Sequence, residues 1–590
     1  GFTDIQLLQS NLPIPALMEC RTNLLRTALA YYDEGRHLKS LVPIREYVQQ
    51  NHPPSLVLIT PLQDYIHSQL HFLKRYDGTD QMPEINKVLT ANSGNIQSVL
   101  GYGLNSENPG IQNTIECTIS FSRFERLIGH GWPALMDAVS PMLAKIKNPK
   151  LQVQFIAEEF TSALSHPVSN HQQLFDQAML YLMDCDDQAL ASHFYQSAGW
   201  FYQYYQTNDI LSTELFRKAF AAAQICGDMT LESNALQSIA QIDWKIGNYV
   251  MGQRHASEAH RLARLSGNLY QEGKGLWVDA MCTRDLGDHD VALKLLHRSR
   301  NCLARCGLAG GRTDAVVMNS LAELHLSKSE YSEAYQIHTN MVQDAVLAMN
   351  KHTYGYCLLN TAQIDVIIGT PANEVQLKID ELKGIFTTSE YATAQITEMV
   401  SAVLSLREGN EAHAGSTLTK YFHKFFGIAA ELALYAIEKL AYGDSSKTFG
   451  WAVVYLSYAF KLKKKLTLHK ALACIGQIYL AQHDRATAHN LLTVALDGFI
   501  QMGVHHDRAR CLLYLGNIAE QEGNVGKATD LWTKARPLFE KCLQSKDVEK
   551  IDAQLAKLVE EKVTTKEECM HYSNSVPVEK TQSRLAMSLI

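Results

Sequence analysis

Apolar positions recur along most of the chain with the 3.6-residue period of amphipathic helices, and short polar connections interrupt them at a regular distance. Most neighbouring connections are 40 residues apart, and the two exceptions are 42 and 34 residues apart. Spacing of this kind is typical of stacked structural repeats. The positions that mark the connections are Thr207, Gly247, Gly287, Ser329, Gly369, Gly409, Gly443, His483 and Gly523.

Small residues recur at fixed places around these connections. Alanine or glycine stands seven residues before eight of the nine, and small residues are again common five residues after them. The side chains at a helix crossing set the distance between the two axes, so close packing requires small ones. Trp532 is expected to fill the wedge one turn further on. The predicted repeat-packing residues are Ala240, Gly247, Ala280, Gly287, Ala292, Ala322, Ala334, Ala362, Gly369, Ala402, Gly409, Ala414, Gly476, Ala488, Gly516, Gly523, Ala528, Trp532 and Ala535.

The pattern predicts an all-α fold in which each repeat is two antiparallel helices that bury their apolar faces against neighbouring repeats. The order of Gly516, Gly523, Ala528, Trp532 and Ala535 resembles the tetratricopeptide (TPR) motif. The usual TPR period is about 34 residues, so we expect helices about one turn longer here. The resemblance implies a TPR-like α-α superhelix, or solenoid, of about nine hairpins over residues 191–561.

The rest of the chain does not follow this period. Residues 1–55 have helical runs around a polar break, YYDEGRH, which fits a winged-helix-like remnant with a short hairpin. Residues 56–190 are helical but irregular, either degenerate repeats or a bridging helical layer. Residues 562–590 are polar and rich in Ser and Thr without a helical period, so we expect a disordered tail.

The segment LKSLVPIREYVQ, residues 38–49, together with the repeats behind it, resembles large fungal STAND-class NTPases of the NB-ARC or NACHT type with C-terminal TPR arrays. In that family a Met-His-Asp sensor of bound nucleotide occupies the place where this chain has Val42-Pro43-Ile44. The resemblance implies that this chain is the C-terminal part, without the NTPase core. It also implies a sensor or regulatory arm, and a homo-oligomer formed through the missing NTPase domain.

Composition narrows the classes of partner. The formal net charge of −7 gives no reason to expect a nucleic-acid partner. The 12 cysteines form no CxxC pair, which favours a reducing, cytoplasmic location. We find no apolar run of about 18 residues that could span a bilayer, so no membrane partner is expected.

Catalytic chemistry has little support in the residues. The glycine-rich stretch GLAGGRTD, residues 307–314, lacks the lysine of a phosphate-binding loop. His255 and His260 share one helix but stand five residues apart, so we expect a solvated polar face rather than metal ligands. We therefore predict no enzyme activity, no cofactor and no metal site.

One basic run and one aromatic cluster have alternative interpretations. The lysines at 461 and 463–465 fit the negative end of a helix dipole, with an acidic partner peptide as the alternative. The aromatics Trp200, Tyr204, Tyr205 and Trp277 fit either core packing or peptide contacts in a concave groove. The chain is thus predicted to bind a protein or peptide ligand on its concave face. The alternative is a scaffold or adaptor subunit with no nucleotide switch.

Overall fold

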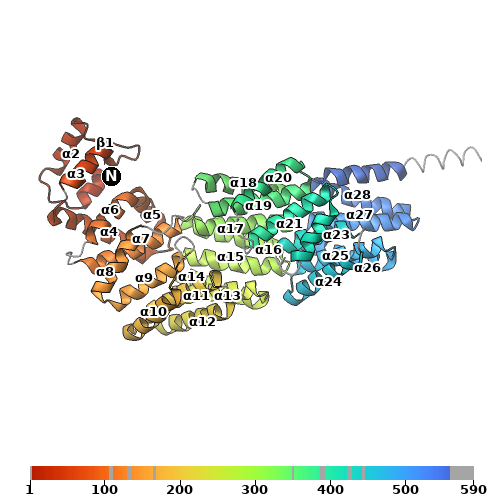
Figure 1. Ribbon diagram of the computed structural model, residues 1–590, viewed down its shortest axis with the longest axis horizontal. Helices are drawn as coiled ribbons and strands as arrows, with labels where there is room; N and C mark the ends of the chain where they lie inside the picture. Colours follow the sequence, from red (N-terminus) through yellow and green to blue (C-terminus); the bar gives the residue numbers. More distant parts are fainter. Residues whose placement is uncertain are drawn as a thin grey trace, which may run out of the picture. The chain divides into compact units, whose positions relative to one another are not determined.

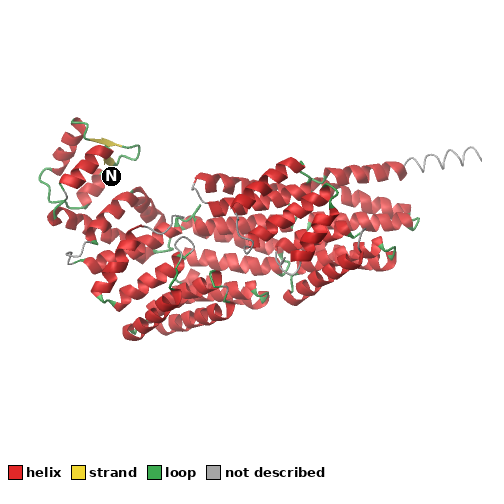
Figure 2. Cartoon of the chain, viewed as in Figure 1, coloured by secondary structure: helices red, strands yellow, loops and turns green. Residues whose placement is uncertain are grey.

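The computed structural model describes residues 3–52, 54–104, 110–128, 134–163, 168–206, 208–347, 351–385, 392–421, 428–441 and 445–558. Within these ranges the chain is almost entirely helical (Figure 2). The packing divides it into unit 1, Gly1–Leu324 with Asn340–Tyr354, and unit 2, His325–Thr339 with Gly355–Ile590. The predicted tail, residues 562–590, lies outside the described residues.

The chain begins with three short helices and one β-hairpin, drawn in red in Figure 1. The antiparallel strands pair Ala30 with Ser40 and Tyr32 with Leu38, so the turn lies at the predicted polar break. Asp33 stabilises this turn, because its Oδ1 accepts a hydrogen bond of 2.8 Å from the backbone N–H of His37. The winged-helix assignment stays a prediction. These elements are α1 (Asp4–Gln9), α2 (Leu17–Arg26), β1 (Ala30–Tyr32), β2 (Leu38–Ser40) and α3 (Val42–Asn51).

Seven helices of unequal length follow, before the regular repeats begin. Helix α7 packs on α4, α8 and α9, and α9 packs on α10 and α11. Apolar clusters hold these layers together, with Phe121, Phe124 and Phe160 fully buried. The helices are α4 (Leu56–Tyr76), α5 (Met82–Ala91), α6 (Ser93–Gly103), α7 (Ile111–Leu127), α8 (Ala134–Ile146), α9 (Pro149–Ser162) and α10 (His171–Cys185).

From α11 onward the described helices follow one another in the TPR-like order, and the strongest packing joins consecutive helices (Figure 1). The unit 1 part comprises α11 (Gln188–Tyr204), α12 (Asp209–Cys226), α13 (Met229–Lys245), α14 (Tyr249–Leu265), α15 (Leu269–Asp285) and α16 (His289–Arg305). Then come α17 (Arg312–Ser327), α18 (Tyr331–Leu347), α19 (Lys351–Ile368), α20 (Ala372–Ile385), α21 (Ala392–Arg407) and α22 (Glu411–Tyr421). The last are α23 (Ile428–Leu440), α24 (Ser445–Leu462), α25 (Lys465–Ala481), α26 (Arg485–Met502), α27 (His505–Gln521) and α28 (Val525–Lys541).

Left-handed backbone at the helix ends sets the repeat length. Every described connection that the sequence pattern marks has a positive φ, from +64° at Ser329 to +92° at Gly369. Thr207 and Gly443 lie outside the described residues. A second series, halfway between the first, was missed by the sequence pattern: Gly227, Gly267, Gly307, Lys463, Gly503 and Leu543. A helix of 17 residues, such as α13 or α14, plus a three-residue turn gives half of the 40-residue period.

An Asp or Asn after the left-handed residue starts the next helix. The side chains of Asp228, Asn268, Asp288, Asp484 and Asn524 each accept a backbone N–H in the first turn of the helix that follows. Such N-caps satisfy donors that would otherwise have no partner at a helix N-terminus. The turn therefore needs only a left-handed residue and a capping residue, which explains how antiparallel helices are joined so tightly.

The predicted packing alanines lie inside the helix contacts, whereas the predicted glycines at 247, 287, 369, 409 and 523 occupy the turns. All of the listed alanines and Trp532 are fully buried, with 0% exposure. A Cβ on Gly516 would stand 2.4 Å from Trp532 Nε1, so α27 can approach α28 only because residue 516 is glycine. The register shifts by one place in α20, where Glu374 is exposed and Val375 is buried.

Candidate binding cavity in unit 1

In unit 1 the start of α15 contacts the connection that follows α4, although almost 200 residues of sequence separate them. Asn268 Nδ2 donates to the backbone oxygen of Asp77 at 3.0 Å, and Tyr270 N donates to Gly78 O at 3.1 Å. Leu269, Leu276 and Cys306 share a core cluster with residues of α4, α5, α6 and α7. The first helices of the pairs, α11, α13 and α15, together with α4, α7 and α9, therefore form a closed circuit.

This circuit contains a cavity of about 330 Å³, lined by residues of α4, α7, α9 and α11 and by Leu231 of α13. Apolar side chains such as Phe124 and Ile119 form part of its wall. Charged side chains form another part, from Lys74 and Arg123 to Asp187. A cavity of this size, apolar with a few polar groups, is typical of a ligand site.

Each carboxylate of the wall has a basic partner. Asp77 Oδ2 lies 2.5 Å from an Arg123 nitrogen, Glu158 lies 3.3 Å from Arg126 Nε, and Glu116 lies 2.6 Å from Lys74 Nζ. Asp187 pairs with Lys150 at 3.0 Å and also caps α11 through the N–H of Leu190. Because these acids are already paired, they leave no unpaired negative charge on the wall.

Two cations of the next first helices, which do not line the cavity, have no such partner among the described residues. Lys274 of α15 donates to Asn234 Oδ1 at 3.0 Å and lies 5.5 Å from the centre of the Tyr270 ring. Arg312 begins α17 and is exposed, and no carboxylate of the described chain lies within ion-pair distance of it. Tyr270 connects the two, since its hydroxyl lies 3.2 Å from Thr313 Oγ1, next to Arg312.

The electrostatics of the cavity disfavour further positive charge. Burial, with the charges of Arg123 and Arg126, lowers the pKa of Lys274 to about 7. Burial and the same two arginines, with Lys74, lower the pKa of His193 to about 3, so this ring is neutral at pH 7.

Of the four predicted groove aromatics, the two tryptophans pack against other side chains and the two tyrosines are partly exposed. Trp200 stacks on Tyr204 at 5.5 Å and also packs on Phe216. Tyr204 and Tyr205 remain 57% and 37% exposed and lie near enough to Arg312 to affect its pKa. Trp277 serves the contact between α15 and α17, because its Nε1 donates to Ser320 Oγ at 2.8 Å. Tyr204 and Tyr205 are thus partly exposed, although each also stacks on another aromatic side chain of α11.

Sequence reasoning missed the charged residues of this region. Arg123, His193, Lys274 and Arg312 stand in four different helices, and no short motif connects them. Only the return of α15 to the 77–78 connection brings them together. A cation at the first position of a helix, as at Arg312, is the one signal in the sequence that could have pointed here, since positive charge is disfavoured at a helix N-terminus.

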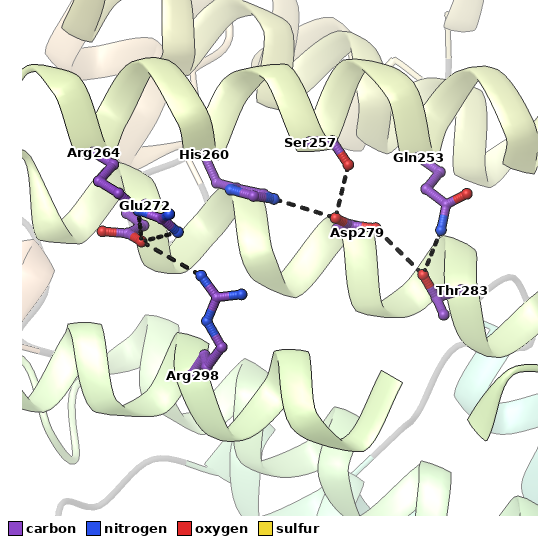
Figure 3. Close-up of polar contacts among 8 residues, drawn as sticks. All are labelled: Gln253, Ser257, His260, Arg264, Glu272, Asp279, Thr283 and Arg298. Atoms are coloured by element: carbon purple, nitrogen blue, oxygen red, sulfur yellow. Dashed lines mark hydrogen bonds and ion pairs between the residues drawn. The ribbon is translucent and has the colours of Figure 1, made fainter. Parts of the chain in front are cut away.

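The prediction of a solvated face for His255 and His260 is wrong. His255 Nδ1 lies 2.8 Å from Asp243 Oδ2, and His260 Nε2 lies 3.3 Å from Asp279 Oδ2. Figure 3 shows His260 pointing from α14 toward Asp279 of the next helix. The two rings lie on different sides of α14, with His255 toward α13 and His260 toward α15.

Asp279 is the centre of a polar ladder between α14 and α15 (Figure 3). It accepts hydrogen bonds from Ser257 Oγ at 3.0 Å and from Thr283 Oγ1 at 3.3 Å, and Thr283 accepts from Gln253 Nε2. Ser257 and His260 both bond to the carboxylate and not to each other, so His260 is not placed to take a proton from Ser257. At Gly275, where a Cβ would stand 2.9 Å from the His260 backbone N, the two helices approach closely. The ladder is therefore a structural contact between repeats.

The structure also corrects the reading of the lysine run. Helix α24 ends at Leu462, so only Lys461 lies in its last turn. Lys463 adopts a left-handed backbone, and Lys464 and Lys465 cap and begin α25. Lys464 and Lys465 thus stand at a helix N-terminus, where the dipole does not favour them, whereas Lys461 and Lys463 lie at the C-terminal end of α24.

Unit 2 has an interior of its own, with a cavity of about 70 Å³. Ionic side chains from three first helices meet there: Glu438 of α23, Lys470 of α25, and Asp507 and Arg510 of α27. Arg510 pairs with Glu438 and lies 3.5 Å from Asp507, which also lies 3.4 Å from Lys470. Acids and bases are therefore matched in this interior.

No family model and no curated protein matches the sequence. Solved structures do. A Rap protein complexed with competence and sporulation factor matches at 13% identity and a TM-score of 0.36, over 72% of this chain and 98% of its own. The STAND protein with a tetratricopeptide repeat sensor from Pyrococcus horikoshii matches at 12% identity and a TM-score of 0.40, over 72% and 61%. Yeast Tom70 matches at 13% and 0.30, over 82% and 98%. Likeness at these values carries no argument about activity or partners.

Within the described ranges, no three His, Cys, Asp or Glu side chains gather as a metal ion would require. In the same ranges no helix is long and apolar enough to cross a membrane.

Proposed function

We propose that this chain is a repeat module that binds a peptide or protein segment, and that the cavity of unit 1 is its binding surface. The observation that supports this most is the closed circuit of first helices around a cavity of about 330 Å³. Stacked helical hairpins commonly present such inner surfaces to partners. Tyr204 and Tyr205 add exposed aromatic area nearby, and aromatic residues dominate many peptide contacts.

In its finer form, the proposal is that this module is the sensor arm of a STAND-type signalling NTPase whose nucleotide-binding domain is outside this chain. The support is the resemblance of residues 38–49 to that family, together with the helix–helix–hairpin–helix order of residues 4–51. Ligand contact would then shift the population between closed and open states. The chain itself is proposed to have no catalytic role, so incubation with ATP should release no phosphate above background.

A scaffold subunit with no nucleotide switch is the alternative. The two differ in what the gene encodes before Gly1. A GxxxxGK[ST] motif after a strand supports the sensor arm. A start codon close to Gly1 supports the scaffold.

The binding surface can be tested by filling the cavity from an exposed position. Ala189 of α11 lines the cavity and is exposed, so Ala189→Trp should occupy the space at little cost to folding. Ala221→Trp on α12 is the matched control, because Ala221 is also an exposed helical alanine and does not line the cavity. Peptides selected from a random display library against the unmodified chain are then titrated onto both variants by fluorescence anisotropy.

We expect the selected peptides to bind Ala221→Trp as they bind the unmodified chain, and to lose roughly tenfold or more in affinity on Ala189→Trp. Equal binding to the two variants would place the surface elsewhere. A library that yields no binding peptide would count against the module as a whole.

A further inference from the structure

We propose that the cavity of unit 1 selects an uncharged aromatic ring that carries one polar atom, as in tryptophan or tyrosine, and that Gln154 and His193 bind this polar atom. The inference rests on the proposed function, since it names the chemistry of the ligand for the same cavity. It starts from the hydrogen-bonding groups of the wall. Gln154 of α9 and His193 of α11 are the two polar side chains of the wall that make no hydrogen bond with another described residue.

These two side chains offer hydrogen bonds without charge, from helices that pack on each other. Burial and nearby cations lower the pKa of His193 to about 3, so its ring is neutral, and one ring nitrogen donates while the other accepts. The Gln154 amide likewise has both donors and an acceptor. A purely aliphatic ligand would displace water from both groups without replacing its hydrogen bonds, which is unfavourable. The ligand therefore needs at least one polar atom.

The ionic groups of the wall disfavour a charged ligand of either sign. Four carboxylates of the described chain line the cavity, and two cationic side chains, Lys74 and Arg123, line it with them. An anionic group would therefore approach an excess of carboxylate oxygens. A cationic group would approach carboxylates that already have basic partners, and Arg123 already acts against positive charge at His193. An uncharged group leaves all four ion pairs intact, so the wall favours it.

The apolar part of the wall requires a ligand with an apolar body. Leu73, Ile119 and Phe124 are buried residues of the wall, and an apolar surface placed against them is removed from water. The volume of about 330 Å³ is near the lower end for small-ligand pockets, so it suits one ring system rather than a whole helix. Tryptophan and tyrosine combine an apolar ring with one uncharged polar atom. The exposed wall residues Lys74 and Ala189 mark the side from which such a ring would enter.

Either a peptide side chain or a small heteroaromatic molecule such as indole can supply this ring, and the test has one arm for each source. The first arm compares four sets of labelled short peptides that differ only at a central residue, which is tryptophan, phenylalanine, glutamate or lysine. Fluorescence anisotropy measures their affinities for the full chain. In the second arm, isothermal titration calorimetry measures the binding of indole alone.

We expect tryptophan peptides to bind roughly tenfold or more tightly than glutamate or lysine peptides. Phenylalanine peptides should bind roughly fivefold more weakly than tryptophan peptides, because phenylalanine lacks the polar atom. Charged peptides that bind as tightly as tryptophan peptides would overturn the inference. Phenylalanine peptides that do so would overturn the role of the polar atom.

Two variants of similar volume test the polar side chains themselves. His193→Phe and Gln154→Met remove the nitrogen and oxygen atoms that would bind the ligand. Each should weaken tryptophan peptides and leave phenylalanine peptides unchanged, and the double variant should bind the two equally. His297→Phe and Gln224→Met, at exposed positions of α16 and α12 that do not line the cavity, are the matched controls and should keep the preference. An equal loss for both peptides would show that a side chain supports the fold instead, and would overturn its assignment.

The outcomes separate this inference from the proposed function. Equal binding of all four peptide sets, still blocked by Ala189→Trp, would overturn the choice of ligand and leave peptide binding at the cavity intact. Binding of indole that Ala189→Trp blocks, with no peptide bound in any set, would support the ligand chemistry and overturn the proposed function. Tryptophan peptides that bind Ala189→Trp as they bind the unmodified chain would overturn the cavity as the site, and with it both proposals.

Discussion

The interiors of unit 1 and unit 2 are built from the same kind of helix pair and differ in how their charges are matched. In unit 1 a cavity of about 330 Å³ remains, and Lys274 of α15 and Arg312 of α17, which do not line it, have no ion-pair partner among the described residues. In unit 2 the cavity is about 70 Å³, and Arg510, Glu438, Asp507 and Lys470 form one ion network. The repeat geometry thus determines how the helices surround an interior in each unit. The side chains of the first helices then determine whether that interior is filled by ion pairs or keeps a cavity.

The turns show a second difference. In the regular part of unit 1 the left-handed positions from 227 to 307 are all glycine. Unit 2 has Ser329, Lys463, His483 and Leu543 at equivalent positions, each with positive φ. A left-handed backbone costs a residue with a Cβ about 1–2 kcal/mol of conformational free energy. The turns of unit 2 therefore contain strain that the regular part of unit 1 avoids.

The largest expected effect comes from breaking the ion network of unit 2. Glu438→Leu removes the buried partner of Arg510 and should lower the free energy of unfolding by about 3–5 kcal/mol, since it leaves a buried charge with one distant acid. Urea denaturation followed by circular dichroism measures the change. Glu540→Leu, at an exposed position of α28, should stay within about 0.5 kcal/mol of the unmodified chain. Similar losses for the two would show that the network is not what holds this interior.

Overpacking a helix contact should have the next largest effect. Ala528 is fully buried between α27 and α28, so Ala528→Trp should lower the free energy of unfolding by about 1–3 kcal/mol. Ala486→Trp, at an exposed position in the first turn of α26, is the control. Calorimetry can follow both, and an unchanged midpoint for Ala528→Trp would contradict the predicted register.

A smaller effect should appear in the turns. Leu543 has φ +57° and is 46% exposed, so Leu543→Gly should stabilise unit 2 by about 1 kcal/mol through relief of backbone strain. Gly227→Ala makes the reverse change at φ +68° in unit 1 and should destabilise by a similar amount. Denaturant midpoints give both values. The same sign for the two substitutions would show that the turns do not differ as described.

The last expected effect is a pH dependence that arises from Lys274 in unit 1. The pKa of Lys274 is about 7 in the folded chain and 10.5 ordinarily, so the unfolded chain binds more protons between these values. The free energy of unfolding should therefore rise with pH from about 7 to 10.5, because the cost of the buried charge is relieved as Lys274 loses its proton. Arg123 and Arg126 lower this pKa and Asp77 opposes them. Lys274→Met should flatten the rise, which denaturant unfolding measured at several pH values would show. An identical slope in the variant would contradict the assignment.

Much of the repeat architecture could be read from the chain itself. Gly516, Ala528 and Trp532 stand at distances that recur, and a small residue at a crossing leaves a periodic signal in any helical repeat. The half-period turns at Lys463 and Leu543 left no such signal. Residues with a Cβ rarely adopt a left-handed backbone, so a lysine or a leucine in the sequence does not predict one. For His260 the sequence predicted a solvent-exposed ring. The ring instead pairs with Asp279 of the next helix, a contact that the sequence pattern could not reveal.

The sequence by itself determined that this protein is a series of paired helices about 40 residues long, because helix period, turn residues and small contact residues are all local properties. Only the tertiary structure decided that unit 1 closes around a cavity, and which charges meet there. Asp77 and Asn268, or Arg123 and Lys274, are separated by more than a hundred residues, so their contact depends on the curvature that many repeats accumulate. No local pattern encodes that curvature, and the matching of acids with bases across a closed circuit follows from it.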